Sequence, residues 1–181
     1  PPAVSQAMGA EQVLVVLADN TPAALKRAYH ALALRWQQEK PGHVEVVVDS
    51  ELQTLPDDRS VWLFGWHNRF RPQLNAALQA YDFAASGDNV RIAGTLLTAQ
   101  THSLAVLGRQ PQSPDQALGW LAADSAAALP GLGRKLPHYG RYSYLAFTGT
   151  APDNVLKGQW PVVNSPLSVQ PLQADGPTVN S

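Results

Sequence analysis

The segment QVLVVLADNTP, residues 12–22, decides how the fold begins. After Gln12 it is a short apolar run, which is typical of a strand buried on both faces inside a parallel sheet. The run ends at Asp19-Asn20. Thr21-Pro22 then favours a helix start, because Thr is a good N-cap residue and Pro suits the first helical position. The segment therefore predicts a buried strand that leads directly into a helix.

The same pattern recurs twice further along the chain. Residues 43–48 (HVEVVV) and 60–66 (SVWLFGW) predict two more strands, which end at Asp49-Ser50 and His67-Asn68-Arg69. Residues 70–83 predict a helix after the third strand. The helix between the first two strands has an apolar face at helical spacing, made by Leu25, Ala28, Tyr29, Leu32 and Trp36.

From residue 89 onward the pattern changes. Residues 90–98 (VRIAGTLLT) and 102–108 (HSLAVLG) are strand-like runs joined by about three residues. A connection this short permits an antiparallel hairpin but no parallel crossover. Ser113 and Gln116 have the spacing of a capping box, which predicts a helix from Ser113. Residues 141–147 (RYSYLAF) predict the last strand of the domain.

Together these elements predict an α/β fold in layers. We expect a mostly parallel sheet, Rossmann-like or flavodoxin-like, with helices on both faces and an antiparallel hairpin near its edge. Residues 1–10 are expected to form a linker or arm, and residues 11–149 the α/β domain. Residues 150–181 are expected to be an extended tail that packs on the domain, with an edge strand near Val162.

Charge and composition exclude several classes of protein. The chain has 181 residues, 13 Lys and Arg against 14 Asp and Glu, and a net charge of −1. This balance argues against nucleic-acid binding and against a polybasic membrane patch. No apolar run reaches the ~18–20 residues that a membrane-spanning helix needs. The chain opens with Pro1-Pro2-Ala3 instead of Met, which suggests a processed or excised piece of a longer protein.

The familiar catalytic and cofactor motifs are missing from the sequence. There is no HExxH and no pair of His at i and i+4 on an expected helix, so a helical zinc site is unsupported. There is no phosphate loop, and the first strand is followed by ADNTPAA instead of GxGxxG. No glycine-flanked nucleophile elbow surrounds Ser50, Ser60, Ser103 or Ser143. With no Cys either, we expect no catalytic residue, no metal ligand and no cofactor in this chain.

The best candidate binding site follows from the position of the strand ends. Ligands of open parallel sheets bind beyond the carboxyl ends of the strands. Asp19 and Asp49 are suited to hold a hydroxyl-rich ligand or a cation, and Arg69 to hold a carboxylate. Asp, Asn and Ser also close turns by bonding local backbone, and this reading stays open. The candidate residues are Asp19, Asn20, Asp49, His67, Asn68 and Arg69.

A second polar cluster lies before the last strand. His138, Tyr139 and Arg141 are suited to form a polar binding rim. The alternative is the C-terminus of a helix, where cations favour the free carbonyls and the helix dipole. Trp160 is expected either to pack the tail onto the domain or to dock it onto a neighbouring domain.

Two stretches of the C-terminal region carry a family resemblance. GRKLPHYGRYSYLAF (133–147) and NVLKGQWPVVNSPL (154–167), extended backward by residues 117–136, resemble the C-terminal region of bacterial peptidase M1-like proteins, a zinc aminopeptidase superfamily. In that family HExxH and a downstream Glu carry the chemistry, and neither has a counterpart here. The resemblance implies a non-catalytic C-terminal domain of a larger, exported protein, with zinc held in a separate domain.

Three functions are consistent with these observations. The first is an accessory domain that packs on other domains of the same parent chain and presents an apolar patch to them. The second is an α/β module that binds a peptide or small molecule at the strand ends. The third is a free-standing hydrolase that pairs Ser50 with His67, which would need the two side chains within hydrogen-bond reach.

Overall fold

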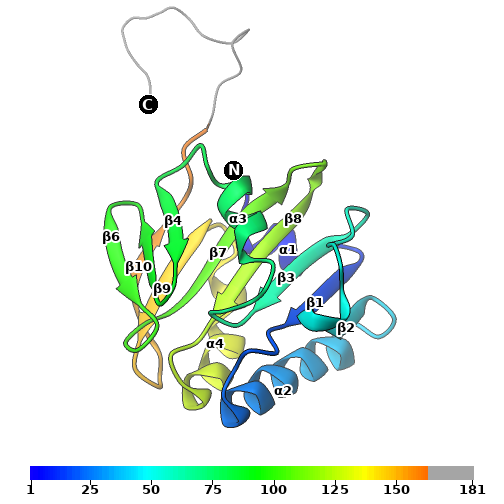
Figure 1. The fold of residues 1–181 in the computed structure, drawn as a ribbon, viewed down its shortest axis with the longest axis horizontal. Coiled ribbons are helices and arrows are strands. Elements are labelled where there is room, and N and C mark those ends of the chain that lie inside the picture. Colours follow the sequence, from blue (N-terminus) through cyan, green and yellow to red (C-terminus); the bar gives the residue numbers. More distant parts are fainter. Residues whose placement is uncertain (163–181) are drawn as a thin grey trace, which may run out of the picture.

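The computed structural model describes residues 1–162, which are built around a seven-stranded mixed sheet (Figure 1). Four strands at one side run parallel, and the other three are antiparallel to their neighbours. The spatial order is β10-β9-β7-β8-β3-β1-β2. The bounds of these strands are β1 (Val13–Leu17), β2 (Val44–Val48), β3 (Ser60–Phe64), β7 (Ser103–Gln110), β8 (Ser113–Ala122), β9 (Tyr144–Thr148) and β10 (Asp153–Gly158).

A second, smaller sheet is antiparallel and has the order β4-β5-β6. Its strands are β4 (Phe83–Ser86), β5 (Asn89–Ile92) and β6 (Thr95–Thr98). The α-helices are α1 (Val4–Met8), α2 (Ala23–Glu39), α3 (Arg71–Ala77) and α4 (Leu129–Lys135). Three short 3₁₀ helices are η1 (Asp49–Glu51), η2 (Ala126–Ala128) and η3 (Leu136–Tyr139).

The two faces of the large sheet bury two different apolar clusters. On one face, residues such as Val15 and Phe64 pack against α1, α2 and α4. On the other face, residues such as Val16 and Leu63 pack against α3 and the small sheet. Every residue of β1 and β3 is buried, as expected for strands covered on both sides. These central strands therefore hold both layers in place.

The predicted fold class is wrong. Residues 1–162 are 28% helical and contain a mixed sheet and a second antiparallel sheet, so they do not form a Rossmann-like or flavodoxin-like layered fold. The first three strands and α2 are where the sequence predicts them. The difference arises after residue 77, where α3 ends six residues before the predicted end of the helix at residue 83, and β4 begins at Phe83.

The largest single error concerns residues 113–122, predicted as a helix and found as β8. Leu118 and Trp120 face one cluster, whereas Ala117 and Leu121 face the other, so the segment alternates between the two cores like a strand. Its capping-box residue Gln116 accepts a hydrogen bond from Ser60 on β3 instead of closing a helix start. Pairing with the fully buried β3 overrides the local helix signal.

The expected hairpin between residues 90–98 and 102–108 is also wrong. Residues 90–98 are divided at Ala93-Gly94, where both residues have positive φ, and the two halves form the β5–β6 hairpin of the small sheet. Positive φ at both central residues is the geometry of a tight hairpin turn. The second run, β7, belongs to the large sheet and pairs with β8 and β9.

Both ends of the described chain pack on the domain. Residues 1–10 include α1, whose Val4 and Ala7 are fully buried. Trp160 is 3% exposed; its backbone N–H donates to Ser143 Oγ and its indole donates to Leu107 O. The described edge strand is β10, upstream of the predicted position near Val162, which is exposed. The rest of the expected tail, residues 163–181, lies outside the described residues.

Both outer strands of the large sheet carry features that discourage further pairing. Beside β2, Gln37 Nε2 donates to Val44 O, and Glu51 Oε1 accepts from Val48 N–H. β10 contains a bulge at which Asn154 Nδ2 donates to Ala146 O and Leu156 O. Side-chain caps and bulges are common ways to protect sheet edges from adding another strand. Within residues 1–162, no helix combines the length and apolar character required to cross a bilayer.

Two buried tryptophans allow a matched test of the core. Trp120 donates its indole N–H to Gly65 O at 2.9 Å, whereas the indole N–H of Trp62 has no partner in the described part of the chain. Both side chains are fully buried. We expect Trp120→Phe to lower the free energy of unfolding by about 1 kcal/mol more than Trp62→Phe, because only the first removes a buried hydrogen bond, while Gly65 O keeps the bond from Asn68 N–H at 3.3 Å. Urea denaturation of both variants measures the difference; equal losses would contradict it.

A buried tyrosine makes stability depend on alkaline pH. Burial raises the pKa of the Tyr29 phenol, and this effect outweighs the hydrogen bond that its oxygen accepts from Ala123 N–H. The folded state therefore holds this proton more tightly than the unfolded state, whose tyrosine pKa is about 10. The contribution of this protonated phenol to the stability of the folded state is fully present below pH ~10. It is lost as the pH rises from there toward the folded-state pKa.

We accordingly expect the unfolding free energy to fall more steeply above pH ~10 in the natural chain than in Tyr29→Phe. At neutral pH the variant should be about 1–3 kcal/mol less stable, since Ala123 N–H loses its acceptor. Denaturant titrations from pH 7 to 11 measure both quantities. A stability difference that does not narrow with rising pH would contradict the pKa shift.

Candidate functional site

The ends of β1, β2 and β3 are joined by one buried carboxylate. Asp49, immediately after β2, is 4% exposed. Its Oδ1 accepts from the backbone N–H of Asp19 at 3.0 Å, and its Oδ2 accepts from the backbone N–H of Arg69 at 2.8 Å. These bonds fix the loops that follow β1 and β3. Asp49 therefore acts in the structure as a link between backbone segments.

Asn68 has a similar role in the loop after β3. It is 3% exposed, and its amide nitrogen donates to Val16 O at 2.9 Å and Phe64 O at 3.2 Å. Its Oδ1 accepts from Phe70 N–H at 3.1 Å. The side chain thus satisfies buried backbone groups where β1 and β3 end and the loop turns toward α3.

The predicted charged residues of the cluster are also engaged. Arg69 donates through Nη1 to the carbonyls of Asp49 and Leu52, and its guanidinium lies 4.9 Å from the ring centroid of Phe70. Asp19 pairs with Lys26 at 3.0 Å on the surface. The strand ends therefore bring four of the predicted residues close together, as the strand-end argument predicts: Asp19, Asp49, Asn68 and Arg69. Each of them bonds to other groups of the protein.

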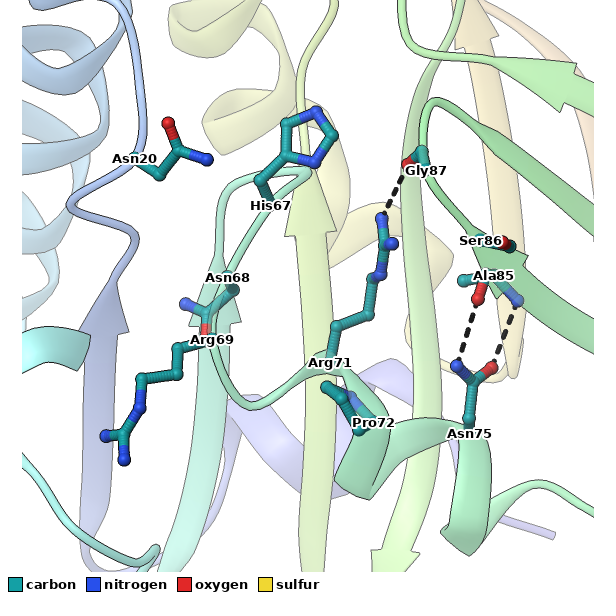
Figure 2. Close-up of a pocket in the computed structure, with 10 residues that line it drawn as sticks. All are labelled: Asn20, His67, Asn68, Arg69, Arg71, Pro72, Asn75, Ala85, Ser86 and Gly87. Carbon is teal, nitrogen blue, oxygen red and sulfur yellow. Dashed lines mark hydrogen bonds between the residues drawn. The ribbon is translucent and has the colours of Figure 1, made fainter.

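An open polar pocket of about 420 Å³ lies beside these strand ends (Figure 2). One wall comes from the loops after β1 and β3, the floor from the start of α3, and the other wall from the end of β4 and the turn after it. Four of the predicted residues contribute to it. The lining residues are Asn20, His67, Asn68, Arg69, Arg71, Pro72, Asn75, Ala85, Ser86 and Gly87.

Arg71 is held rigidly across this pocket. Its Nη1 donates to Trp66 O at 2.8 Å and to Gly87 O at 2.9 Å, so it connects the two walls. The guanidinium lies 5.8 Å from the ring centroid of Trp120. Burial lowers the pKa of Arg71 and the charge of Asp88 acts in the opposite direction. Arg71 remains a cation at every physiological pH.

His67, which lines the pocket, pairs with Asp88. His67 Nε2 lies 2.8 Å from Asp88 Oδ1, and Gln100 Nε2 donates to Asp88 Oδ2 at 3.0 Å. The hydrogen bond from Gln100, followed by the one from His67, lowers the pKa of Asp88. No hydrogen bond joins His67 to Ser50 within residues 1–162, so the predicted nucleophile–base pair is not assembled.

Further hydrogen bonds fix the small sheet to α3 and to the loop after β3. Asn75 donates to Ala85 O and accepts from Ala85 N–H, both at 3.0 Å. Trp66 Nε1 donates to Gly87 O at 3.1 Å, the carbonyl that Arg71 also contacts. Hydrogen bonds within the protein therefore hold the far wall of the pocket in place.

The second predicted cluster does not line the pocket. His138 is exposed at η3, and the ring of Tyr139 packs against Phe147 at 5.7 Å. Arg141 donates to the hydroxyl of Tyr142, which lowers the pKa of that phenol. Both contacts are made within the protein. Any binding role of His138, Tyr139 and Arg141 stays a prediction.

Sequence reasoning missed several residues of the pocket. Arg71 lies two residues beyond Arg69, inside the helix predicted over residues 70–83, and its type alone did not mark it as a site residue. Ser86 and Gly87 follow that predicted helix, and nothing local indicates that they face His67. Their approach depends on the small sheet, for which the sequence predicted residues 90–98 as one strand and did not predict β4.

The comparisons add no family assignment. No protein-family model matches the chain, and no curated protein matches it. Within residues 1–162, no group of three or more His, Cys, Asp or Glu side chains is arranged to hold a metal ion.

Two asparagines at the site provide a matched test of their roles. We expect Asn68→Ala to lower the free energy of unfolding by about 2 kcal/mol or more, because it removes three hydrogen bonds to buried backbone. Asn20→Ala, which removes an exposed side chain without a protein partner in the described region, should change it by less than about 0.5 kcal/mol. Thermal and urea unfolding of both variants measure this contrast. Similar losses would mean that Asn68 does not hold the strand ends.

Proposed function

We propose that this chain is a non-catalytic accessory domain of a larger bacterial metallopeptidase-like protein, and that it binds a peptide or small molecule in the strand-end pocket. One observation carries the proposal. The deepest polar side chains at the strand ends, Asp49 and Asn68, bond to backbone, so they shape the pocket instead of reacting in it. The open pocket beside them offers polar groups to a ligand.

The surroundings of three buried serines also favour binding over hydrolysis. Ser60 Oγ donates to Gln116 and accepts from Ala117 N–H. Ser103 Oγ donates to Asp124, and Ser143 Oγ accepts from Trp160 N–H. All three are buried. A nucleophile must reach a substrate and a base, and these hydroxyls are instead part of the packing.

The two stretches that carry the family resemblance belong to one packed unit. Residues 144–148 and 153–158 pair as β9 and β10. Lys135 donates to Pro152 O at 2.6 Å, which ties α4 to the turn between them. Trp160 stacks on Tyr81 with a centroid distance of 4.9 Å. This shared structural role gives a physical reason for the two stretches to occur together, and it supports treating them as one family feature.

The proposal predicts that the purified chain has no peptidase activity of its own. With zinc added, hydrolysis of a panel of aminoacyl reporter substrates should equal the buffer blank, because the described residues assemble neither a metal site nor an activated nucleophile. A known zinc aminopeptidase serves as the positive control. Zinc-dependent cleavage that His67→Gln abolishes would overturn the non-catalytic proposal.

A further inference from the structure

We propose that the strand-end pocket is a carboxylate site in which Arg71 is the principal ligand-binding group. The inference rests on the proposed binding function, because it names the chemical class of ligand for the same pocket. It depends on the way the chain positions Arg71 and on the hydrogen-bonding groups that surround it.

Arg71 has a fixed guanidinium with free donors. Its Nη1 is held by two backbone carbonyls, and the group lies over the ring of Trp120. Its Nε and Nη2 have no partner among the described residues, and none of the ion pairs there includes Arg71. A half-buried cation that is fixed in place and lacks a carboxylate partner is prepared to accept one from a ligand.

Asn20 adds a hydrogen-bond donor at the same end of the pocket as Arg71. Figure 2 shows the His67 ring between Asn20 and the head of Arg71 at the same end of the pocket. Asn20 has no side-chain partner in the described region and offers an amide donor. The nearby carboxylate, Asp88, is already bonded to His67 and Gln100.

The geometry favours a carboxylate over other small ligands. A guanidinium edge presents two parallel N–H groups, which match the two oxygens of one carboxylate. A cationic ligand would be repelled by Arg71, and Asp88 would repel a phosphate dianion more strongly than a carboxylate monoanion. The volume, about 420 Å³, lies within the range of small-molecule sites. The free end of a short peptide has both the size and the charge required.

The test uses the whole chain and two probes that differ only in their end group. Acetyl-Ala-Ala carries a terminal carboxylate, and its C-terminal amide does not. In a titration followed by backbone amide NMR, we expect the acid to shift the resonances of residues 66–71 and 85–88. The affinity obtained from these shifts should be at least tenfold lower for the amide than for the acid. Inorganic phosphate is a third probe.

Three variants connect the binding to the pocket. Arg71→Lys keeps the charge but loses the two-pronged contact, so affinity for the acid should fall about tenfold or more. Asn20→Ala, an exposed position, should weaken binding severalfold without unfolding the chain. Arg27→Lys, on the exposed side of α2, should bind like the natural chain.

Each other outcome would overturn the inference in a recognisable way. Equal binding of acid and amide, or binding of phosphate alone, would reject the carboxylate class and leave a binding pocket in place. If Arg71→Lys and Asn20→Ala stay folded and bind the acid as the natural chain does, the assignment of this pocket is wrong. If no probe shifts the pocket resonances, both the carboxylate site and the pocket-binding part of the proposed function fail.

Discussion

The arrangement of the strand ends depends on the buried carboxylate of Asp49. It accepts one backbone N–H from the loop after β1 and another from the loop after β3, although it belongs to neither strand. A buried carboxylate is costly unless its oxygens are hydrogen-bonded, so this pairing satisfies Asp49 and fixes the two loops at the same time. Asn20 and His67 are carried on those loops. The geometry of the pocket wall therefore follows from an interaction that lies beneath it.

The opposite wall depends on the small sheet, and its attachment uses one carbonyl. Gly87 O accepts from the indole of Trp66 and from the guanidinium of Arg71. Both donors belong to the loop after β3 or to the start of α3. The turn after β4 is thus fixed to the same loop that Asp49 and Asn68 hold. Because both walls are fixed through one loop, a ligand would meet a pocket that needs little ordering.

Local pattern was sufficient for the elements whose own residues show how they are buried. The runs that became β1, β2 and β3 and the amphipathic α2 were predicted because burial on both faces, or on one stripe, leaves a local signature. β8 was not, because the spacing of Ser113 and Gln116 suggested a helix start, whereas the segment pairs antiparallel with the adjacent β7 and parallel with Val61 and Trp62 of β3, more than fifty residues earlier. The break of residues 90–98 at Ala93-Gly94 was hidden inside an apolar run.

The same division applies to the pocket. Asn20, His67, Asn68 and Arg69 could be predicted because they follow parallel strands, which place their carboxyl ends together. The sequence could not show that Asn68 and Arg69 would be engaged by backbone and that the neighbouring Arg71 would keep free donors. That depends on which side chains lie within hydrogen-bond distance of a backbone carbonyl when the small sheet is packed in place. Residue type thus predicted where the polar groups gather, while tertiary packing decided which of them remain available to bind.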